Sequence, residues 1–592
     1  MGKTIEHRGP DNFSTLISGN AGFAHNRLSI IDPTEAGNQP FANERYVLTY
    51  NGEIYNYLDL KRALVEQGVF FRSTSDTEVL FHSLIRNGVE ATTKSIDGMF
   101  AFAFYDKREG TIVLCRDRLG IKPLYWTHRA GSLFYGSEIK AIAAAVPVEA
   151  DSIRALYSLS LRPEIRRTTS LFRNVNSLEP GTYLKFKPSD SPKIIRYFSL
   201  VDLVDENHHR ELGRLNLQTA QEMFLERMKE SVRSMLMSDV PMGVFVSGGV
   251  DSSLVAALVK DAGSNVNLFT ANILGKLSEF GSAQALARSI DLPLSDYRFS
   301  PEMLVRDLVH VTWHNESPLI HNHEAAALMN VARLARSEGV KPVLTGEGAD
   351  ELFLGYSWMS RQWLKAKFPG LTGILQKLIG RSKQARHEQR EFIESLIEEG
   401  CEQRKFQAEA SAALESFSAE DAKLSSTTLD VLRTNVYALL HRNDRMGMTA
   451  SIESRFPFLD EELIRFGVNL PTKWKIRWTA SLHDKRHPFL KDKFILRKAA
   501  ERCLPPRLAR NPKNPFPTYG PRFFQVRRGF FKDGYVSELL SLNRAVADAT
   551  LDESQSVHTG KLVSLEVFGR LFARRESEDD VDSHVQRFVS MK

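Results

Sequence analysis

The stretch VFVSGGVDSS (residues 244–253) sets out an apolar strand, a glycine turn and the start of a helix. Two adjacent glycines let the backbone approach an anion closely, and serine hydroxyls and amides at a helix N-terminus can donate to it. The stretch lacks the GxxxxGK(S/T) spacing of a Walker loop. If it stood alone, the best interpretation would be an ordinary strand-to-helix turn.

A second loop of the same kind, TGEGADE (345–351), follows the apolar residues 342–344. Strands such as 267–273 alternate with helical stretches such as 324–340, which predicts a doubly wound parallel sheet with its site at the carboxyl ends of the strands. Asp251 and Asp350 could then share Mg²⁺, which prefers carboxylates plus substrate oxygens. The alternative is that each aspartate only caps a helix.

Residues 20–145 contain short apolar strands rich in β-branched and aromatic residues, with helical stretches at 57–68 and 75–88. This pattern predicts a sheet-rich α+β domain. The polar, turn-rich stretch 178–200 reads as a linker. We therefore expect a first domain at 1–195, a second at 205–530 with a charged helical insertion near 359–428, and a C-terminal helical extension at 531–592.

Composition excludes several classes of protein. With 592 residues the chain is too long for one core, and its net charge of +6 comes with no Lys/Arg-dense stripe that would favour nucleic acid. Cys115, Cys401 and Cys503 have no CxxC spacing, which fits a reducing cytosol. No apolar run reaches the roughly 18 residues that would cross a membrane. We expect a soluble, cytoplasmic, multidomain protein, and a homodimer is compatible with the sequence.

Two later stretches carry charge. DRMGMTASIESRFPFLD (444–460) packs arginines and acids into a turn, for which structural ion pairing is the simplest interpretation. Residues 491–516 supply Lys493, Arg497 and Lys513, which could neutralise charge on a leaving pyrophosphate. Spacing alone is weak support for such a role, because surface lysines and arginines are common.

The ordered motifs resemble glutamine-dependent asparagine synthetase of the bacterial type, from His7 to about residue 520. The markers are HRGPD, RLSIID, YNGEIYN, SDTE, GMFAFAFYD, RDRLGIKPLY, SEIKAI, SDVPMGVFVSGGVDSS, TGEGADELFLGY, DRMGMTASIESRFPFLD and ILRKAA. The resemblance implies an N-terminal-nucleophile glutaminase domain and a synthetase domain of the PP-loop ATP-pyrophosphatase type. In such enzymes aspartate and ATP form β-aspartyl-AMP and pyrophosphate, and ammonia from glutamine then displaces AMP.

By matching position, the resemblance assigns roles to residues of this chain. Glutamine would be held by Arg27, Asn51, Gly52, Glu53 and Asp76, with Asn51 and Gly52 also forming the oxyanion hole. Pyrophosphate would be held by Ser247, Gly248, Gly249, Asp251, Ser252 and Ser253, and AMP by Ala271, Thr345 and Gly346. Asp251 and Asp350 would hold Mg²⁺, Glu347 would act in catalysis, Lys513 and Arg497 would complete the catalytic phosphate end, and Glu453 would bind the acceptor.

The start of the sequence departs from the family, which places a catalytic cysteine after the initiator methionine and an apolar strand before HRGPD (7–11). Here Gly2 holds the second position, the strand is missing, and no cysteine matches the nucleophile. We expect this chain not to hydrolyse glutamine, and its first domain to be less stable than its second. Either the gene begins upstream of Met1, which the intact glutamine-pocket match favours, or the protein is an ammonia-dependent or repurposed synthetase.

Other departures concern the acceptor. Gly447 stands where the family often has serine, and Glu316-Ser317-Pro318 leads to His321-Asn322-His323, which we interpret as acceptor-pocket or structural residues. The helical insertion and the C-terminal segment lie outside the resemblance. Asparagine synthesis is the leading hypothesis. The alternatives are an amidating or cyclising ligase acting on a sugar acid, peptide or other carboxylate, and a regulatory relative that only binds nucleotide.

Overall fold

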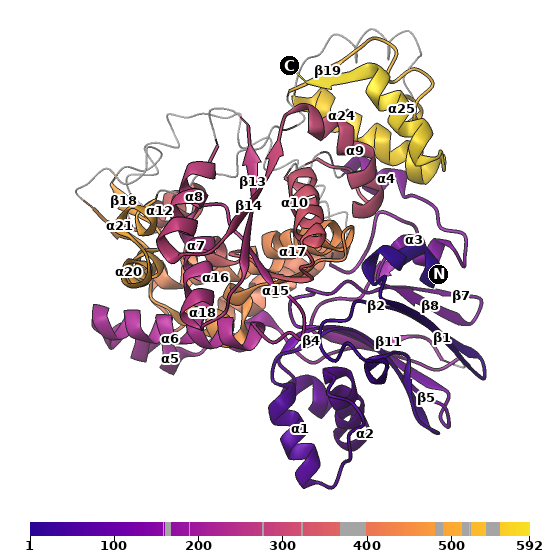
Figure 1. Cartoon of the computed structure of the whole chain (residues 1–592), viewed down its shortest axis with the longest axis horizontal. Helices are drawn as coiled ribbons and strands as arrows, with labels where there is room; N and C mark the ends of the chain where they lie inside the picture. Colours follow the sequence, from indigo (N-terminus) through magenta and orange to yellow (C-terminus); the bar gives the residue numbers. More distant parts are fainter. Residues whose placement is uncertain are drawn as a thin grey trace.

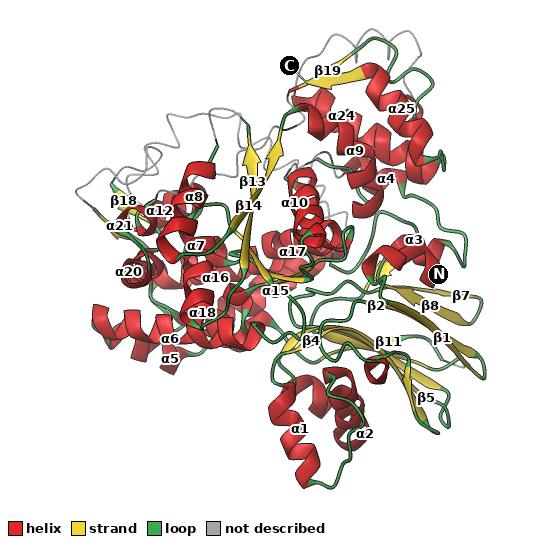
Figure 2. Cartoon of the chain, viewed as in Figure 1, coloured by secondary structure: helices red, strands yellow, loops and turns green. Residues whose placement is uncertain are grey.

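The computed structural model describes residues 1–157, 159, 167–188, 190–274, 278–320, 324–367, 398–479, 489–511, 520, 523–539 and 557–591. A sheet-rich N-terminal part lies against a larger part in which helices surround a parallel sheet (Figures 1 and 2). No helix among these residues is long and apolar enough to cross a membrane.

A six-stranded antiparallel sheet of order β11-β10-β6-β5-β4-β3 organises the N-terminal part. Along β5, Phe100, Phe102 and Phe104 alternate with the small residues Ala101 and Ala103. The phenylalanines belong to a core with residues of helix α2, whereas the alanines belong to a second core with residues of β7 and β8. The elements are β3 Phe41–Ala42, β4 Tyr46–Ile54, α1 Tyr57–Glu66, α2 Asp76–Ser95, β5 Gly98–Asp106, β6 Thr111–Arg116, β10 Thr182–Phe186 and β11 Lys193–Arg196.

The second layer on this sheet consists of two separate pieces. One is the hairpin β1 (Asn12–Ser18) and β2 (Ala21–Arg27), and the other is the three-stranded sheet β8-β7-β9. The strands of the second piece are β7 Tyr125–Arg129, β8 Ser132–Gly136 and β9 Asn176–Ser177. Residues Gly2–Arg8 form the short 3₁₀ segment η1 beside β2 and α3 (Ile139–Ala143).

The prediction of a linker at 178–200 is wrong where two strands of the six-stranded sheet, β10 and β11, lie within it. Residues 182–186 form β10, which pairs with β6 and with β11. Leu184 and Phe186 are buried, so the alternation of the sequence TYLKF has the period of two that a strand requires. The turn-forming residues around it had suggested a loop, but the buried alternate side chains decide the structure.

The predicted doubly wound sheet is confirmed, with order β14-β13-β12-β15-β16 and parallel pairing throughout. In chain order this is 3-2-1-4-5, so the direction of winding reverses between β12 and β15, where ligands bind in such folds. The elements around it are α6 Leu217–Met235, β12 Gly243–Phe245, α7 Val250–Asp261, β13 Asn267–Ile273, α8 Phe280–Ile290, β14 Leu294–Phe299, α9 Glu302–Asn315, α10 Ala325–Ser337, β15 Pro342–Leu344, α11 Ala349–Leu352 and β16 Glu453–Arg455.

Helices complete the molecule. The described part of 359–428 is mainly helical, as expected, and the C-terminal helices pack against α9 together with a two-stranded sheet (Figure 2). The elements are α4 Ser152–Tyr157, α5 Glu206–Arg214, α12 Ser357–Lys367, α15 Glu398–Ala413, α16 Ala419–Val431, α17 Tyr437–Met448, α18 Glu461–Asn469, α19 Thr472–Lys475, β17 Arg477–Trp478, β18 Leu490–Lys491, α20 Phe494–Cys503, α21 Pro506–Ala509, β19 Phe524–Val526, α22 Tyr535–Leu539, α24 Val557–Phe568, α25 Glu578–Phe588 and β20 Val589–Met591.

Candidate active sites

The SGGVDSS loop joins β12 to α7 at the carboxyl edge of the parallel sheet. Gly248 has a φ of +81°, and a Cβ there would lie 2.7 Å from Cβ of Ser282, so this turn requires glycine. The Ser252 hydroxyl accepts a hydrogen bond of 3.1 Å from the Ser247 amide, which folds the loop over the start of α7. The first amides of α7 therefore face the loop, as an anion site requires.

The TGEGADE loop lies directly on the SGGVDSS loop. A Cβ at Gly346 would lie 2.6 Å from the Ser252 nitrogen and 3.0 Å from the Asp251 carbonyl carbon. Thr345, which follows β15, donates its amide to the Arg455 carbonyl oxygen at 3.0 Å. The structure thus brings together the predicted pyrophosphate residues with Thr345 and Gly346, and Ala271 lies near the carboxyl end of β13, the neighbouring strand.

Lys493 joins the two predicted metal ligands. Its Nζ lies 2.6 Å from Oδ2 of Asp251 and 2.7 Å from Oδ1 of Asp350, and its side chain is completely buried. The lysine has a left-handed backbone with φ of +46° just before α20, which carries it toward the two loops. The sequence indicated the lysine as a phosphate-neutralising cation but not this bridge, because the three residues lie far apart along the chain.

Glu347, the predicted catalytic carboxylate, is held by Arg442 of α17. The Arg442 guanidinium donates to Oε1 of Glu347 at 2.7 Å and also pairs with Glu324. The side chain of Glu347 is 31% exposed whereas that of Arg442 is 6% exposed, so the carboxylate reaches open space from a fixed support. Neighbouring Glu351 is buried and accepts from the Tyr356 hydroxyl at 2.6 Å, and burial raises its pKa to about 7.

Two predicted residues lie apart from these loops. Arg497 is fully buried, pairs with Asp492 at 2.9 Å and donates to the Asn511 carbonyl oxygen at 2.6 Å. It reaches the SGGVDSS loop through Asn511, whose amide donates to the Gly248 carbonyl oxygen at 3.1 Å. Glu453 pairs in register with Pro342 at the amino edge of the parallel sheet, opposite the edge that carries the loops.

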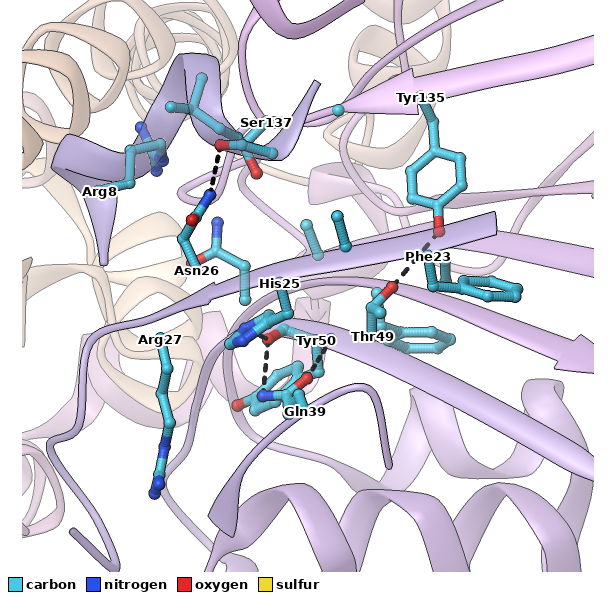
Figure 3. A pocket seen from close by; sticks show the side chains of 18 of the residues that line it. Arg8, Phe23, His25, Asn26, Arg27, Gln39, Thr49, Tyr50, Tyr135 and Ser137 are labelled. Carbon is cyan, nitrogen blue, oxygen red and sulfur yellow. Dashed lines mark hydrogen bonds between the residues drawn. The ribbon is translucent and has the colours of Figure 1, made fainter. Parts of the chain in front are cut away.

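A cavity of about 830 Å³ is lined by all five predicted glutamine residues, Arg27, Asn51, Gly52, Glu53 and Asp76. Figure 3 shows Arg27 and other lining residues, among them Tyr50 and Gln39. Arg27 donates to the carbonyl oxygens of Thr34, Ile31 and Asp32. The Nδ2 of Asn51 is buried without a hydrogen-bond partner among the described residues. A Cβ at Gly52 would lie 2.1 Å from the Met99 carbonyl oxygen, so no larger residue fits there.

Two buried carboxylates, Asp76 and Glu53, line this cavity together with cationic side chains such as Arg27 and Lys122. Asp76 accepts hydrogen bonds from the Tyr50 hydroxyl at 2.7 Å and the Ile54 amide at 3.0 Å, both neutral donors. Burial raises the pKa of Asp76 to about 6 and raises the pKa of Glu53 well above its usual range. Glu53 lies 3.5 Å from Arg455, which also contacts Glu453 at 3.1 Å. Because the described donors to Asp76 are neutral, its carboxylate is the group that could pair with a cationic ligand such as an α-ammonium.

Comparison with known proteins assigns a family to each half of the chain. Residues 1–198 match the glutamine amidotransferase domain and residues 223–587 match asparagine synthase. Asparagine synthetase [glutamine-hydrolyzing] 3 of Bacillus subtilis is 30% identical over 578 residues, which cover 93% of this chain and 87% of that protein.

The chain belongs to the asparagine synthase family.

Another relative is asparagine synthetase [glutamine-hydrolyzing] 1 of Bacillus subtilis. It is 30% identical in a match that covers 87% of this chain and 83% of that protein. Amidase chry2 of Gibberella zeae is 32% identical over 60% of this chain and 54% of its own length. The match to asparagine synthase reaches residue 587, so our expectation that the C-terminal segment lies outside the resemblance was wrong.

Several motif residues of this asparagine synthase chain join its two parts rather than line a site. Arg8 donates to both oxygens of Asp444 at 2.8 and 2.9 Å and lies 3.0 Å from Glu138. Arg445 pairs with Glu138 at 3.2 Å and with Glu316 at 2.8 Å. The interpretation of residues 444–460 as structural ion pairing is therefore supported for Asp444 and Arg445.

The same region brings His7, Glu138 and His314 together, with potential metal-ligand atoms within 4.8 Å of one another. Glu138 already lies 2.6 Å from Lys140 as well as close to Arg8 and Arg445. Burial acts to raise the pKa of Glu138, but these cations hold it well below its usual range. These cations would repel a metal ion at His7, Glu138 and His314. We therefore interpret the cluster as a network of ion pairs centred on Glu138.

No cysteine lines the cavity among the described residues. Cys115 is fully buried in β6, where burial raises the pKa of its thiol well above the usual range, and Cys503 lies in α20. Cys401 lies in α15, its side chain outside the described part. Lys513 and His321-Asn322-His323 also lie outside the described residues, so their roles stay predictions.

Proposed function

We propose that this chain makes asparagine from aspartate and ATP through β-aspartyl-AMP, and that it takes its nitrogen from ammonia. The observation that carries the proposal is the meeting of the SGGVDSS and TGEGADE loops at the switch point of the parallel sheet, with Asp251 and Asp350 on one ammonium. Anion-binding amides and carboxylates that suit a cation lie together there, as cleavage of ATP to AMP and pyrophosphate requires.

The first step forms an acyl-phosphate bond. A β-carboxylate oxygen of aspartate attacks the α-phosphorus of ATP, the bond to the bridging oxygen of the β-phosphate breaks, and pyrophosphate leaves with that electron pair. Charge develops on the pyrophosphate, next to the amides of the SGGVDSS loop and to Lys493. Because these groups are fixed before reaction, they stabilise that charge without reorganisation.

The second step forms the amide. The nitrogen of ammonia attacks the acyl carbon, the bond from that carbon to the AMP oxygen breaks, and a proton leaves the nitrogen. Glu347 is the carboxylate best placed to take it, since Arg442 holds it at 2.7 Å while part of it stays exposed. A general base must be positioned within hydrogen-bond reach of the proton it removes.

Asp251 and Asp350 fit Mg²⁺ by their chemistry, because Mg²⁺ is held by one or two carboxylates plus phosphate oxygens. When bound, the ion would neutralise phosphate charge. Lys493 supplies one positive charge between these carboxylates. We infer that Mg²⁺ enters with ATP, whose phosphates add the charge that a second cation requires.

The nitrogen source follows from the residues around the cavity. Hydrolysis of glutamine in an N-terminal-nucleophile domain needs a nucleophile beside the oxyanion hole. Asn51 and Gly52, the expected oxyanion-hole residues, line the cavity, whereas no cysteine lines it among the described residues. We therefore propose that ammonium, and not glutamine, supports synthesis by this chain. We also propose that the reaction takes place in the cytoplasm.

The test supplies the purified chain with ATP, Mg²⁺ and aspartate, plus either ammonium or glutamine, and follows pyrophosphate and asparagine. We expect asparagine with ammonium and none above background with glutamine. Asparagine from glutamine at a comparable rate would overturn the proposed nitrogen source. Pyrophosphate release that does not depend on aspartate would favour a ligase acting on another carboxylate.

A further inference from the structure

Arg442 of α17 binds two carboxylates at the synthetase edge. Its Nη2 donates to Oε1 of Glu347 at 2.7 Å, and its Nη1 donates to Oε1 of Glu324. The side chain of Arg442 is buried, whereas those of Glu347 and Glu324 are 31% and 26% exposed. The two carboxylates are therefore neighbours on one fixed guanidinium, and part of each stays open to a ligand.

The fold explains how Glu324 reaches this position. It immediately precedes α10, which packs against α17. Ala325, Ala326 and Ala327 are fully buried, and their small side chains let the start of α10 lie close to its neighbours. Glutamate is not among the residues preferred before a helix, and the Glu324 side chain accepts no capping hydrogen bond. Helix capping therefore does not account for a glutamate here.

These three side chains carry more negative than positive charge. One guanidinium balances one carboxylate, and within the described part of the chain no ion pair joins Glu347 or Glu324 to a second cation. Lys493, the other cation of this site, already contacts the two predicted metal ligands. A carboxylate that is largely removed from water without a cation of its own is costly. A positively charged group on a substrate would remove this cost.

The position of Glu324 beside Glu347 suits an ammonium group of the acceptor. In the proposed reaction Glu347 takes a proton next to the acyl carbon, and Glu324 lies on the other terminal nitrogen of the same guanidinium. In aspartate a single methylene separates the reacting carboxyl carbon from the carbon that bears the ammonium. An acceptor whose acyl carbon lies at Glu347 therefore carries its ammonium close enough to meet the neighbouring carboxylate.

We propose that Glu324 selects the acceptor by binding the α-ammonium of an amino acid whose side-chain carboxylate reacts, so that carboxylates without the amine react poorly. The inference rests on the proposed function and names the substrate class of that site. Hydrogen bonds between charged groups are roughly twice as strong as neutral ones. A site built to bond one polar group of its substrate rejects an analogue that lacks this group, because the site's own partner is left unpaired.

The test compares aspartate with succinate and glutamate with glutarate, since each second compound lacks only the amine. Pyrophosphate release is measured with ATP, Mg²⁺ and ammonium for the unaltered chain and for Glu324→Gln, which removes the charge and keeps the shape. We expect kcat/KM for the amino acid to fall by roughly tenfold or more in the variant, and that for the dicarboxylate to stay nearly unchanged. Glu338→Gln, at the exposed far end of α10, is the matched control and should keep both values.

The outcomes separate this inference from the proposed function. An equal fall for aspartate and succinate in Glu324→Gln would mean that Glu324 only positions Arg442, and would overturn the inference alone. Release with glutamate but not aspartate, with the same selective loss in the variant, would overturn aspartate as acceptor and support the role of Glu324. Release with neither amino acid would overturn both. If the variant does not fold, equal kcat/KM for aspartate and succinate in the unaltered chain would still overturn the inference, and a clear preference for aspartate would support it.

Discussion

The two candidate sites differ in how their buried charges are matched. At the edge of the parallel sheet, Asp251 and Asp350 share Lys493, and Glu347 is paired with Arg442. In the N-terminal cavity, the donors described for Asp76 are neutral. A buried carboxylate without a close cation is costly, whereas a matched pair of charges costs much less.

The difference separates a site that is complete before its substrate arrives from one that is not. The synthetase edge holds its loops and charges in place through contacts within the chain. The N-terminal cavity is lined by Asn51 and Gly52, the expected oxyanion-hole residues, and the described hydrogen-bond donors to its Asp76 are neutral. A ligand ammonium would supply a charged donor to Asp76, which fits the expected binding of glutamine there.

The largest expected effect comes from removing a carboxylate at the synthetase edge. Asp251→Asn and Asp350→Asn should each lower aspartate-dependent pyrophosphate release by roughly 10³-fold, because each removes a carboxylate that we propose holds Mg²⁺ at the phosphates. Asp261→Asn, at the exposed end of α7, is the matched control and should keep its rate. Retention of most activity in both variants would contradict the assignment of these aspartates to the phosphate site.

Removal of the bridging cation should affect stability as well as activity. Lys493→Met leaves Asp251 and Asp350 facing each other without their ammonium, which should cost about 3–5 kcal/mol of unfolding free energy. Millimolar Mg²⁺ without nucleotide should then raise the Tm of the variant, since the metal replaces the lost charge.

Calorimetry with and without Mg²⁺ measures this effect. The control is Lys498→Met on the same helix, whose ammonium pairs with Glu501 near the surface. We expect Mg²⁺ to leave the Tm of the unaltered chain and of the control nearly unchanged. An equal Mg²⁺ shift in all three proteins would show that Lys493 does not occupy the charge position of the metal.

The sequence predicted the loops of the synthetase edge better than it predicted their surroundings. A glycine turn between a strand and a helix is a local feature, and parallel topology brings two such turns to one edge. The Lys493 bridge depends on a left-handed residue more than 140 positions beyond Asp350 along the chain, and no local pattern encodes that contact.

For Glu453 the sequence failed in the opposite way, because it predicted a role in the site that the structure does not support. The resemblance to asparagine synthetase, by matching position, assigned Glu453 to the acceptor. The register of β16 against β15 puts it at the other edge of the sheet, where it meets Lys122 at 2.8 Å. Sequence motifs can mark contacts between domains as clearly as they mark catalysis, and only the register distinguishes the two.

The smallest effect tests the charge of the N-terminal cavity. The pKa of Asp76 is raised from its ordinary value to about 6, chiefly by burial. A carboxyl whose pKa is raised by folding adds stability below its unfolded pKa and loses it as the pH rises through its folded pKa. The N-terminal part should therefore lose on the order of 3 kcal/mol from this group between about pH 4 and pH 7.

Asp76→Asn keeps an acceptor for the Tyr50 hydroxyl but cannot ionise, so the variant should gain stability over the unaltered chain as the pH rises from 4 to 7. Urea unfolding with amide exchange of β4 as the local readout measures the difference at each pH. Asp59→Asn, exposed on α1, should show no such trend. A stability difference for Asp76→Asn that stays constant over this range would mean that the cavity already neutralises its carboxylates, and the contrast between the two sites would fail.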